Sequence, residues 1–175
     1  ATFLLIDTLA QFLFRSVYTF KSLVVSGDFD LILTKPINPL FRILAGGPDA
    51  IDFLTLPLII AVVAYVASLL NPDILHTIYY IALVINGVLI AMAFHIIVLS
   101  IGIITLEVDH IVMVFRDLSS MGRLPIDIYK EPLKSILTFI VPVGVMITVP
   151  AKALMGIVSP LGILSTLIFG SVFLV

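Results

Sequence analysis

The acidic and histidine residues best suited to bind a metal ion lie close together, at Glu107, Asp109 and His110. Glu107 and His110 would share one face of a helix, because residues three apart are neighbours on a helix surface. One helical turn supplies too few ligands for a metal site, which needs further side chains from elsewhere in the fold. We therefore interpret this group as a charged turn in contact with water, and we predict no metal site.

Sequence motifs for catalysis are missing. There is no G-x-x-x-x-G-K-[ST] loop to hold nucleotide phosphates, so any ATP and its Mg²⁺ would be bound by another polypeptide. The serines have no G-x-S-x-G elbow and no acid–base partner, and the sequence has no cysteine to supply a thiolate. These features argue against an intramembrane hydrolase, and we expect no cofactor in this chain.

Polar residues recur along the first apolar run with spacings of four, four, three and four residues. They are Asp7, Gln11, Arg15, Tyr18 and Ser22. This spacing places them along one stripe of a helix. Such a stripe in a membrane helix faces either the interior of a helix bundle or a path for substrate, and we expect the interior.

Two histidines and one asparagine stand alone in later apolar runs, at His76, His95 and Asn86. A histidine at membrane depth acts either as a proton relay or as a hydrogen-bonded packing residue. We expect the packing role for both histidines. For Asn86 we expect a hydrogen bond between neighbouring helices.

The elements that carry these residues must lie in a membrane. The sequence of 175 residues is 61% hydrophobic and 11% charged, whereas soluble domains carry about 25% charged residues. A net charge of −2 with scattered basic residues argues against nucleic acid as a partner. We expect an all-α, polytopic transmembrane bundle that forms one domain over residues 1–175, surrounded by lipid and truncated at both ends.

Long apolar runs predict the membrane-spanning helices. The predicted spans cover residues 2–25, 53–70, 74–105 and 111–121, the fourth being short and rather polar, and 161–175 is expected to begin a final span that the end of the sequence cuts short. Gly27 is expected to end the first span, and the Asn71-Pro72-Asp73 turn to end the second. The run 74–105 is longer than a perpendicular crossing needs, so it must tilt, kink at Gly87 or Gly102, or project from the membrane.

A further apolar run, 133–149, is interrupted by Pro142 and Gly144 and is closed by Pro150. Pro142 lacks an N–H group and clashes with the carbonyl of Thr138, which would lose its helical partner. In a membrane a freed carbonyl must be covered by protein or water. The pattern predicts either a span with a proline kink or a re-entrant pair of short helices, and we favour the second.

The stretch GDFDLILTKPINPLF, residues 27–41, separates two of the apolar runs. Asp28 and Asp30 favour the positive end of a short helix, whose apolar surface is Leu31 and Leu33. The helix would end near Lys35, because Pro36 cannot continue it. An Asn38-Pro39 turn and a second short segment, 40–44, would follow. Such an amphipathic element is either an interfacial anchor or a docking site for a partner.

This stretch resembles the "G-x-(L/F)-D-x-x-L-x-(R/K)-P-(L/I)-(N/D)-P-L-F" segment of bacterial ABC transporter permeases of the type-two exporter class, in particular a subfamily of small permeases. A second block, MGRLPIDIYKEPLKSILTFIVPVGVMITVPAKALMG at residues 121–156, is similar to another segment of that subfamily. The two blocks occur in the same order as in the family. Departures are Lys35 for the usual Arg, Leu124 for an aromatic residue, and Thr148-Val149 for an aromatic pair.

The resemblance implies a membrane subunit, used in pairs with a second or homologous permease copy, which works with a separate ABC ATPase that binds ATP and Mg²⁺. It implies that 28–41 is a short cytoplasmic coupling helix and turn that contact the ATPase. The residues concerned are Asp28, Asp30, Leu31, Leu33, Lys35, Pro36, Asn38, Pro39 and Phe41. It also implies a bacterial inner-membrane location, with about five of six spans visible.

By the same resemblance, residues 123–151 form the re-entrant element on the outer side of the membrane. Its marker residues are Pro125, Tyr129, Pro142, Gly144 and Pro150. If 133–149 crosses the membrane instead, 107–132 becomes one cytoplasmic loop. The resemblance names no substrate. The alternative function is a channel or scaffold with no motor, which copurification of a P-loop ATPase would distinguish from a transporter subunit.

Overall fold

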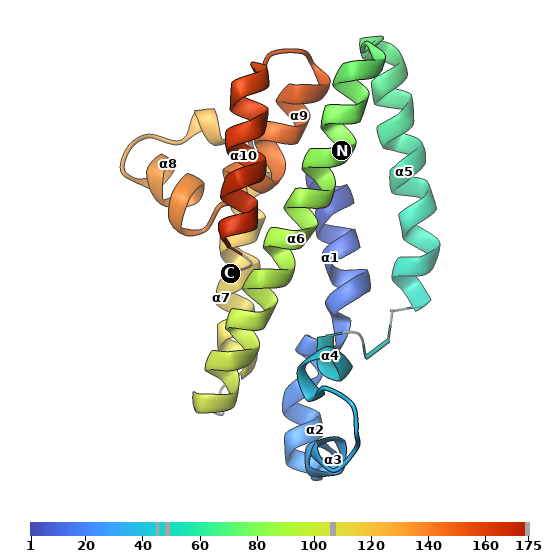
Figure 1. Ribbon diagram of the computed structural model, residues 1–175, viewed down its shortest axis with the longest axis vertical. Helices are drawn as coiled ribbons and strands as arrows, with labels where there is room; N and C mark the ends of the chain where they lie inside the picture. The colour runs from blue at the N-terminus through green and yellow to red at the C-terminus, as the bar shows by residue number, and fades with distance from the viewer. Residues whose placement is uncertain (45, 48–49, 106–107, 174–175) are drawn as a thin grey trace.

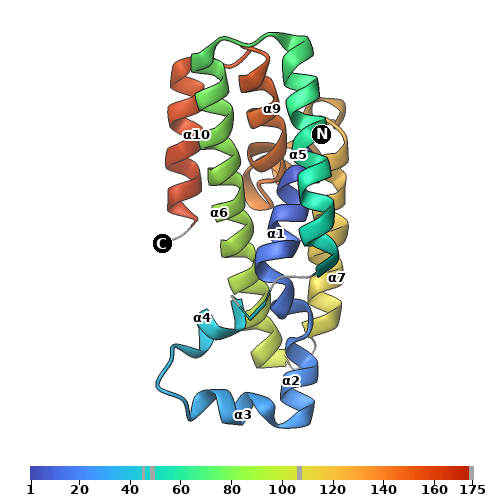
Figure 2. The same ribbon diagram turned by 90° about the vertical axis from the view of Figure 1, so that its right-hand side faces the viewer.

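Helices of very different lengths run up and down one long axis in the computed structural model, which describes residues 1–44, 46–47, 50–105 and 108–173 (Figures 1 and 2). Within these residues the regular structure is entirely helical. The elements are α1 (Thr2–Tyr18), α2 (Phe20–Ser26), α3 (Asp28–Leu33), α4 (Pro39–Leu44), α5 (Ala50–Leu70), α6 (Ile74–Thr105), α7 (Val108–Ser120), η1 (Met121–Arg123), η2 (Ile126–Ile128), α8 (Leu133–Ser135), η3 (Ile136–Ile140), η4 (Gly144–Thr148), α9 (Val149–Leu154) and α10 (Pro160–Val172).

Three helical stretches of the described chain are long and apolar enough to cross a membrane: Thr2–Ser26, Ala50–Leu70 and Ile74–Thr105. They match the first three predicted spans. The run 161–175, expected to begin a final span, is described as the apolar helix α10, and its completion as a span stays a prediction. The predicted span at 111–121 is not found as a span, because the helix described there, α7, has 13 residues. At 1.5 Å per residue this is about 20 Å, short of a hydrocarbon core of about 30 Å.

The first span is bent along its length. Phe14 has non-helical backbone angles (φ −116°, ψ 22°), and Thr19 separates α1 from α2. Gly27 ends α2 with a left-handed backbone (φ 80°), which a glycine adopts without steric cost. The predicted helix end at Gly27 is therefore confirmed. The bend at Phe14 was not predictable, because no proline or glycine lies there.

The central element is α6, which runs obliquely through the bundle as one unbroken helix of 32 residues (Figure 1). It packs against α1, α7, α9, α10 and η4. Gly87 lies where α6 meets η4, and a side-chain carbon there would come within 2.9 Å of the carbonyl oxygen of Met146. A glycine is thus needed for this close approach.

The predicted packing roles of Asn86 and His95 agree with the structure. Asn86 donates a hydrogen bond from its amide to the carbonyl of Thr166 in α10, at 3.2 Å. His95 is buried and hydrogen-bonded on both ring nitrogens. His76 lies in the first turn of α6, with Nδ1 3.9 Å from a carboxylate oxygen of Asp73, and its hydrogen-bonded packing role stays a prediction.

The remaining span, α5, packs along α1 and buries none of its residues. Its surface is apolar on all sides, with large exposed side chains such as Leu54, Leu58 and Leu69. Leu56, Ile59, Val63 and Ala67 are partly buried against the core, and the apolar surface that stays exposed is suited to contact with lipid or with another membrane protein.

The two ends of the bundle carry different structures. At the end drawn lowest in Figures 1 and 2, α3 lies across the long axis, outside the main helices. At the opposite end, the α5–α6 turn lies near α9 and the loop between α9 and α10. We call residues 28–44 the lower segment and Leu133–Leu154 the bent hairpin.

Candidate functional site

The lower segment begins with α3, the predicted short helix after Gly27. Asp28 and Asp30 occupy its first turn, where carboxylates favour the positive end of a helix. No residue of α3 is buried, and Leu31 and Leu33 are 60% and 52% exposed. Apolar side chains on a segment outside the bundle are available to a partner or to the membrane surface.

The second half of the lower segment follows the predicted Asn38-Pro39 turn. The side-chain oxygen of Asn38 accepts hydrogen bonds from the backbone N–H groups of Leu40 and Phe41, at 3.0 and 3.3 Å. Pro39 then starts α4, a position where its missing N–H costs nothing. Phe41 is 66% exposed, whereas the last residues of α4, Ile43 and Leu44, are buried in the main core.

The lower segment is therefore anchored at both ends and exposed between them. Phe29 of α3 packs edge-on against Phe20 of α2, with ring centroids 5.1 Å apart. Ile43 and Leu44 attach α4 to the core, and α4 contacts α1. Lys35 and Pro36 lie in the exposed connection between the two helices. A force applied to the exposed part would pass through these anchors to α1 and α2.

The bent hairpin shows the break that Pro142 and Gly144 predicted. Two helical stretches, Leu133–Ile140 and Gly144–Leu154, meet at an angle of 76° around 141–143. Both stretches include a π-helical turn, η3 and η4. The hydroxyl of Thr138 donates to the carbonyl of Lys134 at 2.7 Å. The break is observed, and re-entrance remains a prediction.

The other marker residues of this element hold the bent hairpin against the bundle. Pro150 is fully buried in the first turn of α9. Gly144 packs on Ile126, next to Pro125, so that the loop can approach η4. The backbone N–H of Ile126 donates to the hydroxyl of Thr148 at 3.2 Å. The Tyr129 hydroxyl donates to the carbonyl of Met121 at 2.8 Å.

An ion-pair cluster that the sequence did not indicate joins this loop to both arms of the bent hairpin. Asp127 lies 3.5 Å from the ammonium of Lys134 and 2.5 Å from that of Lys152. The hydrogen bond from Lys152 holds the pKa of the Asp127 carboxyl below its ordinary value of 3.8, and Lys134 adds to the effect. Because all three side chains are partly exposed, the cluster orients the loop more than it stabilises the fold.

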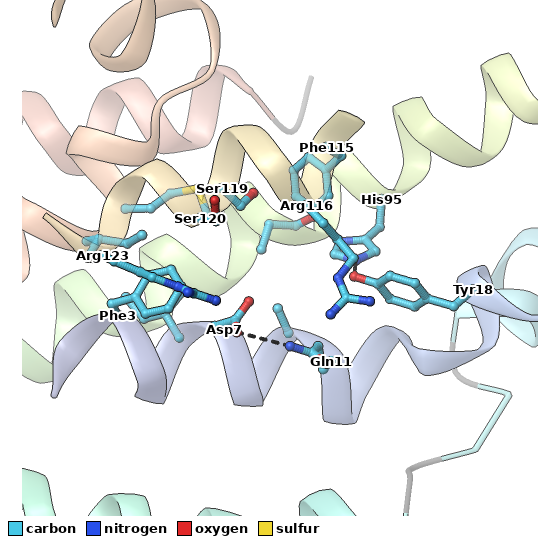
Figure 3. A pocket seen from close by; sticks show the side chains of 15 residues that line it. Phe3, Asp7, Gln11, Tyr18, His95, Phe115, Arg116, Ser119, Ser120 and Arg123 are labelled. Carbon is cyan, nitrogen blue, oxygen red and sulfur yellow. Dashed lines mark hydrogen bonds between the residues drawn. The ribbon is translucent and has the colours of Figure 1, made fainter. Parts of the chain in front are cut away.

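A polar cavity of about 70 Å³ lies in the middle of the bundle, between α1, α6, α7 and η4 (Figure 3). Asp7, Gln11 and Tyr18 of the predicted polar stripe face it. Gln11 donates a hydrogen bond to the carboxylate of Asp7 at 3.0 Å. Three of the five stripe residues thus face the interior, as predicted, whereas Arg15 is not among the residues that line the cavity. The last member of the stripe, Ser22, lies beyond the bend and donates to the carbonyl of Thr19.

The end of the cavity nearest the bend is closed by a buried histidine. Nδ1 of His95 lies 2.7 Å from the carbonyl of Ala91, which can only accept, so Nδ1 carries the hydrogen. Nε2 of the neutral ring then accepts from the Tyr18 hydroxyl at 3.1 Å. Phe14 and Phe115 pack on the same ring, with centroids 5.2 and 5.1 Å away. This cluster ties α1 to α6 at the level of its bend.

Two arginines from α7 and η1 complete the cavity, and no sequence pattern grouped them with α1. Figure 3 shows Arg123 of η1 extending beside Phe3 toward Asp7, and the guanidinium of Arg116 of α7 lying near Gln11 and Tyr18. Arg116 lies over the Tyr18 ring at 5.9 Å, and Arg123 lies over the Phe3 ring at 5.6 Å. They are more than 90 residues from the stripe in sequence, so only the fold brings them together.

The group considered first for metal chemistry, at Glu107, Asp109 and His110, lies partly outside the described residues, so its predicted role as a charged turn stays a prediction. Glu107 lies outside the described residues, and so does the Asp109 side chain. Over residues 1–44, 46–47, 50–105 and 108–173, no group of three or more His, Asp or Glu side chains is arranged to hold a metal ion.

Comparison with known proteins agrees with this architecture. No curated protein and no solved structure matches the chain. A family model described as "ABC-2 family transporter protein" matches residues 1–175, the whole sequence. That match covers the apolar spans, the lower segment and the bent hairpin alike. The chain therefore belongs to the ABC-2 transporter family and is a multi-pass permease component of an ABC transporter.

Proposed function

We propose that this permease is the membrane subunit of an ATP-driven exporter and that its lower segment docks a separate ATPase. The observation that carries the proposal is the exposed apolar row of the lower segment. Leu31, Leu33 and Phe41 are more than half exposed, although each end of the segment is anchored. An apolar patch held outside a bundle by short anchors is typical of a docking surface.

The connection from the lower segment to the cavity supports a coupling role. From α3 the chain leads through α2 directly into α1, which lines the polar cavity. The bends at Phe14 and Thr19 divide this path into units that can tilt separately. ATP and Mg²⁺ would be bound by the partner. Closure of the partner around ATP would push on α3 and change the tilt of α1.

The proposed arrangement places two permease copies, identical or homologous, around one path in the bacterial cytoplasmic membrane. The lower segment would lie in the cytoplasm with the ATPase, and the bent hairpin would lie on the outer side as a re-entrant element. The unburied apolar surface of α5 provides area for contact with lipid or with the second copy.

The direct test of docking replaces Leu31 and Leu33 by aspartate in the same chain. Two carboxylates on the apolar row would make ATPase binding unfavourable by desolvation, while leaving the bundle intact because neither side chain is buried. We expect the double variant to insert normally but to lose copurification of the ATPase and stimulation of its activity.

The matched control is Leu124→Asp with Ile128→Asp, two exposed apolar residues near the opposite end. This pair should retain ATPase stimulation. If the Leu31 and Leu33 variant stimulates ATP hydrolysis and transports as well as the wild type, the docking proposal is wrong. If no P-loop ATPase copurifies even with the wild-type chain, the protein works without a motor.

A further inference from the structure

Positive charge faces the polar cavity without close carboxylate partners. The ionic side chains that line it are Asp7, Arg116 and Arg123. Among the residues that the structure describes, neither arginine forms an ion pair within 4 Å, and each guanidinium lies against an aromatic ring. The Asp7 carboxylate accepts a hydrogen bond from the Gln11 amide. The arginines therefore keep N–H donors available for an anion.

An apolar groove of about 380 Å³ lies beside this cavity. Phe3, Arg123 and Ile147 line both spaces, so the two spaces adjoin at these residues. Beyond this point the groove is lined by Val66, Leu70 and other largely apolar residues of α5, α9 and the following loop. A small polar space thus joins a larger apolar one, with a cation at the junction.

We propose that the cavity and the groove together bind an amphiphile with a small anionic headgroup, such as a phosphate or sulfate ester of an aliphatic chain. The headgroup lies between Arg116 and Arg123, and the chain lies along the groove toward Leu70. This names the substrate class of the exporter, so it rests on the proposed transport function. Charge complementarity carries the assignment, because the single carboxylate of Asp7 balances at most one of the two arginines, and an anion supplies the remaining counter-charge.

The size of the two spaces supports this occupant. A cavity of about 70 Å³ accepts a headgroup of a few atoms but not a sugar chain or a peptide. The larger groove suits an unbranched aliphatic chain, because its lining offers few polar partners. A cationic amphiphile of the same shape would meet two like charges in the cavity, which disfavours its binding.

Binding is measured with the full chain in phosphatidylcholine nanodiscs, without the ATPase, using radiolabelled dodecyl phosphate as the probe. Dodecyltrimethylammonium of equal chain length and inorganic phosphate serve as competitors. We expect dodecyl phosphate to bind saturably and the ammonium to compete poorly. Inorganic phosphate should compete only at much higher concentration, since it lacks the aliphatic chain. Competition by phosphate as strong as by unlabelled dodecyl phosphate would overturn the role of the groove.

Variants in the cavity make the test specific. Arg116→Gln and Arg123→Gln should each weaken binding about tenfold, the scale of one charge-assisted hydrogen bond. Asp7→Asn should strengthen it, because it removes the only carboxylate that faces the headgroup among the described lining residues. A gain in affinity cannot arise from misfolding. Arg42→Gln, an exposed arginine of α4 away from the cavity, should leave binding unchanged.

Equal binding of the ammonium, or arginine variants that bind like the wild type, would overturn the proposal. Weaker binding by Asp7→Asn would also overturn it and would point to a cationic or proton-coupled ligand. The outcome is separable from that of the docking experiment. Binding is measured on the permease alone. The amphiphile can therefore bind in a protein that does not couple to the ATPase, and it can fail to bind in one that does.

Discussion

The lower segment and the bent hairpin are both short helices separated by proline and glycine, yet they are built in opposite ways. None of the residues of α3 is buried, whereas all five residues of η4 are buried. The lower segment exposes Leu31, Leu33 and Phe41, while the bent hairpin buries Leu137, Met146 and Pro150. One region presents its apolar side chains and the other uses them to hold the bundle together.

This difference shows that interrupted helices do not share one purpose. In the bent hairpin, Pro142 and Gly144 redirect the chain so that η4 can pack on α6 and α1. In the lower segment, Pro36 and Pro39 keep the chain away from the bundle between its anchors at Phe29 and Ile43. Substitutions should therefore affect mainly stability in the bent hairpin and mainly partner binding in the lower segment.

The largest contrast is expected from one substitution made in both regions. Leu137→Ala empties a fully buried position and should lower the free energy of unfolding by about 2–5 kcal/mol. Leu31→Ala removes an exposed side chain and should change it by less than about 0.5 kcal/mol. Unfolding of purified protein in mixed micelles measures both values. Equal losses of stability would remove the distinction between the two regions.

A smaller contrast is expected from two threonines. Thr148→Val leaves the buried N–H of Ile126 without its acceptor, which should cost about 1–3 kcal/mol. Thr34→Val removes only an exposed hydroxyl that donates to the carbonyl of Leu31, and it should be nearly neutral. Hydrogen exchange at the Ile126 amide supplies a local readout. Exchange that stays as slow in Thr148→Val as in the wild type would show that this hydrogen bond does not hold the loop.

The smallest effect is expected from acid. Because the folded-state pKa of Asp127 is depressed, its ion pairs contribute fully above the ordinary pKa near 3.8, and the contribution is lost as pH falls through the lower folded value. The loss should be below about 1 kcal/mol, as for other exposed ion pairs. Asp127→Asn should abolish this part of the pH dependence of stability, whereas Lys130→Gln in the same loop should retain it. If the stability of Asp127→Asn still falls at acid pH as that of the wild type does, other groups cause the pH dependence.

Much of the fold follows from hydropathy and from the glycines and prolines that end or break helices. Apolar length predicted the first three spans, and Gly27, Pro36 and Pro142 marked real ends or breaks, because a missing N–H or side chain acts locally. The span expected at 111–121 is not found, since an apolar run does not by itself fix helix length, whereas the start of a span expected at 161–175 is described as the apolar helix α10.

The candidate sites, like the fold, were predictable from the sequence only in part. The spacing of Asp7, Gln11 and Tyr18 predicted a stripe that faces inward, because helical periodicity is a local property. Which residues it would face was not predictable. Arg116 and Arg123 reach the stripe only through the packing of α7 on α6 and α1. The Asp127 cluster likewise joins three elements that are separated in sequence.

The central claim is that the two regions lie on opposite sides of the membrane, the lower segment inside and the bent hairpin with its preceding loop outside. The chain has no cysteine, so single cysteines at Thr34 and at Lys130 are clean probes. Both positions are exposed, and Lys130 leaves the Asp127 ion pairs intact. A membrane-impermeant maleimide applied to intact cells and to inverted vesicles should label the cysteine at 34 only from the cytoplasmic side and that at 130 only from outside. Labelling of both positions from the same side would contradict the account.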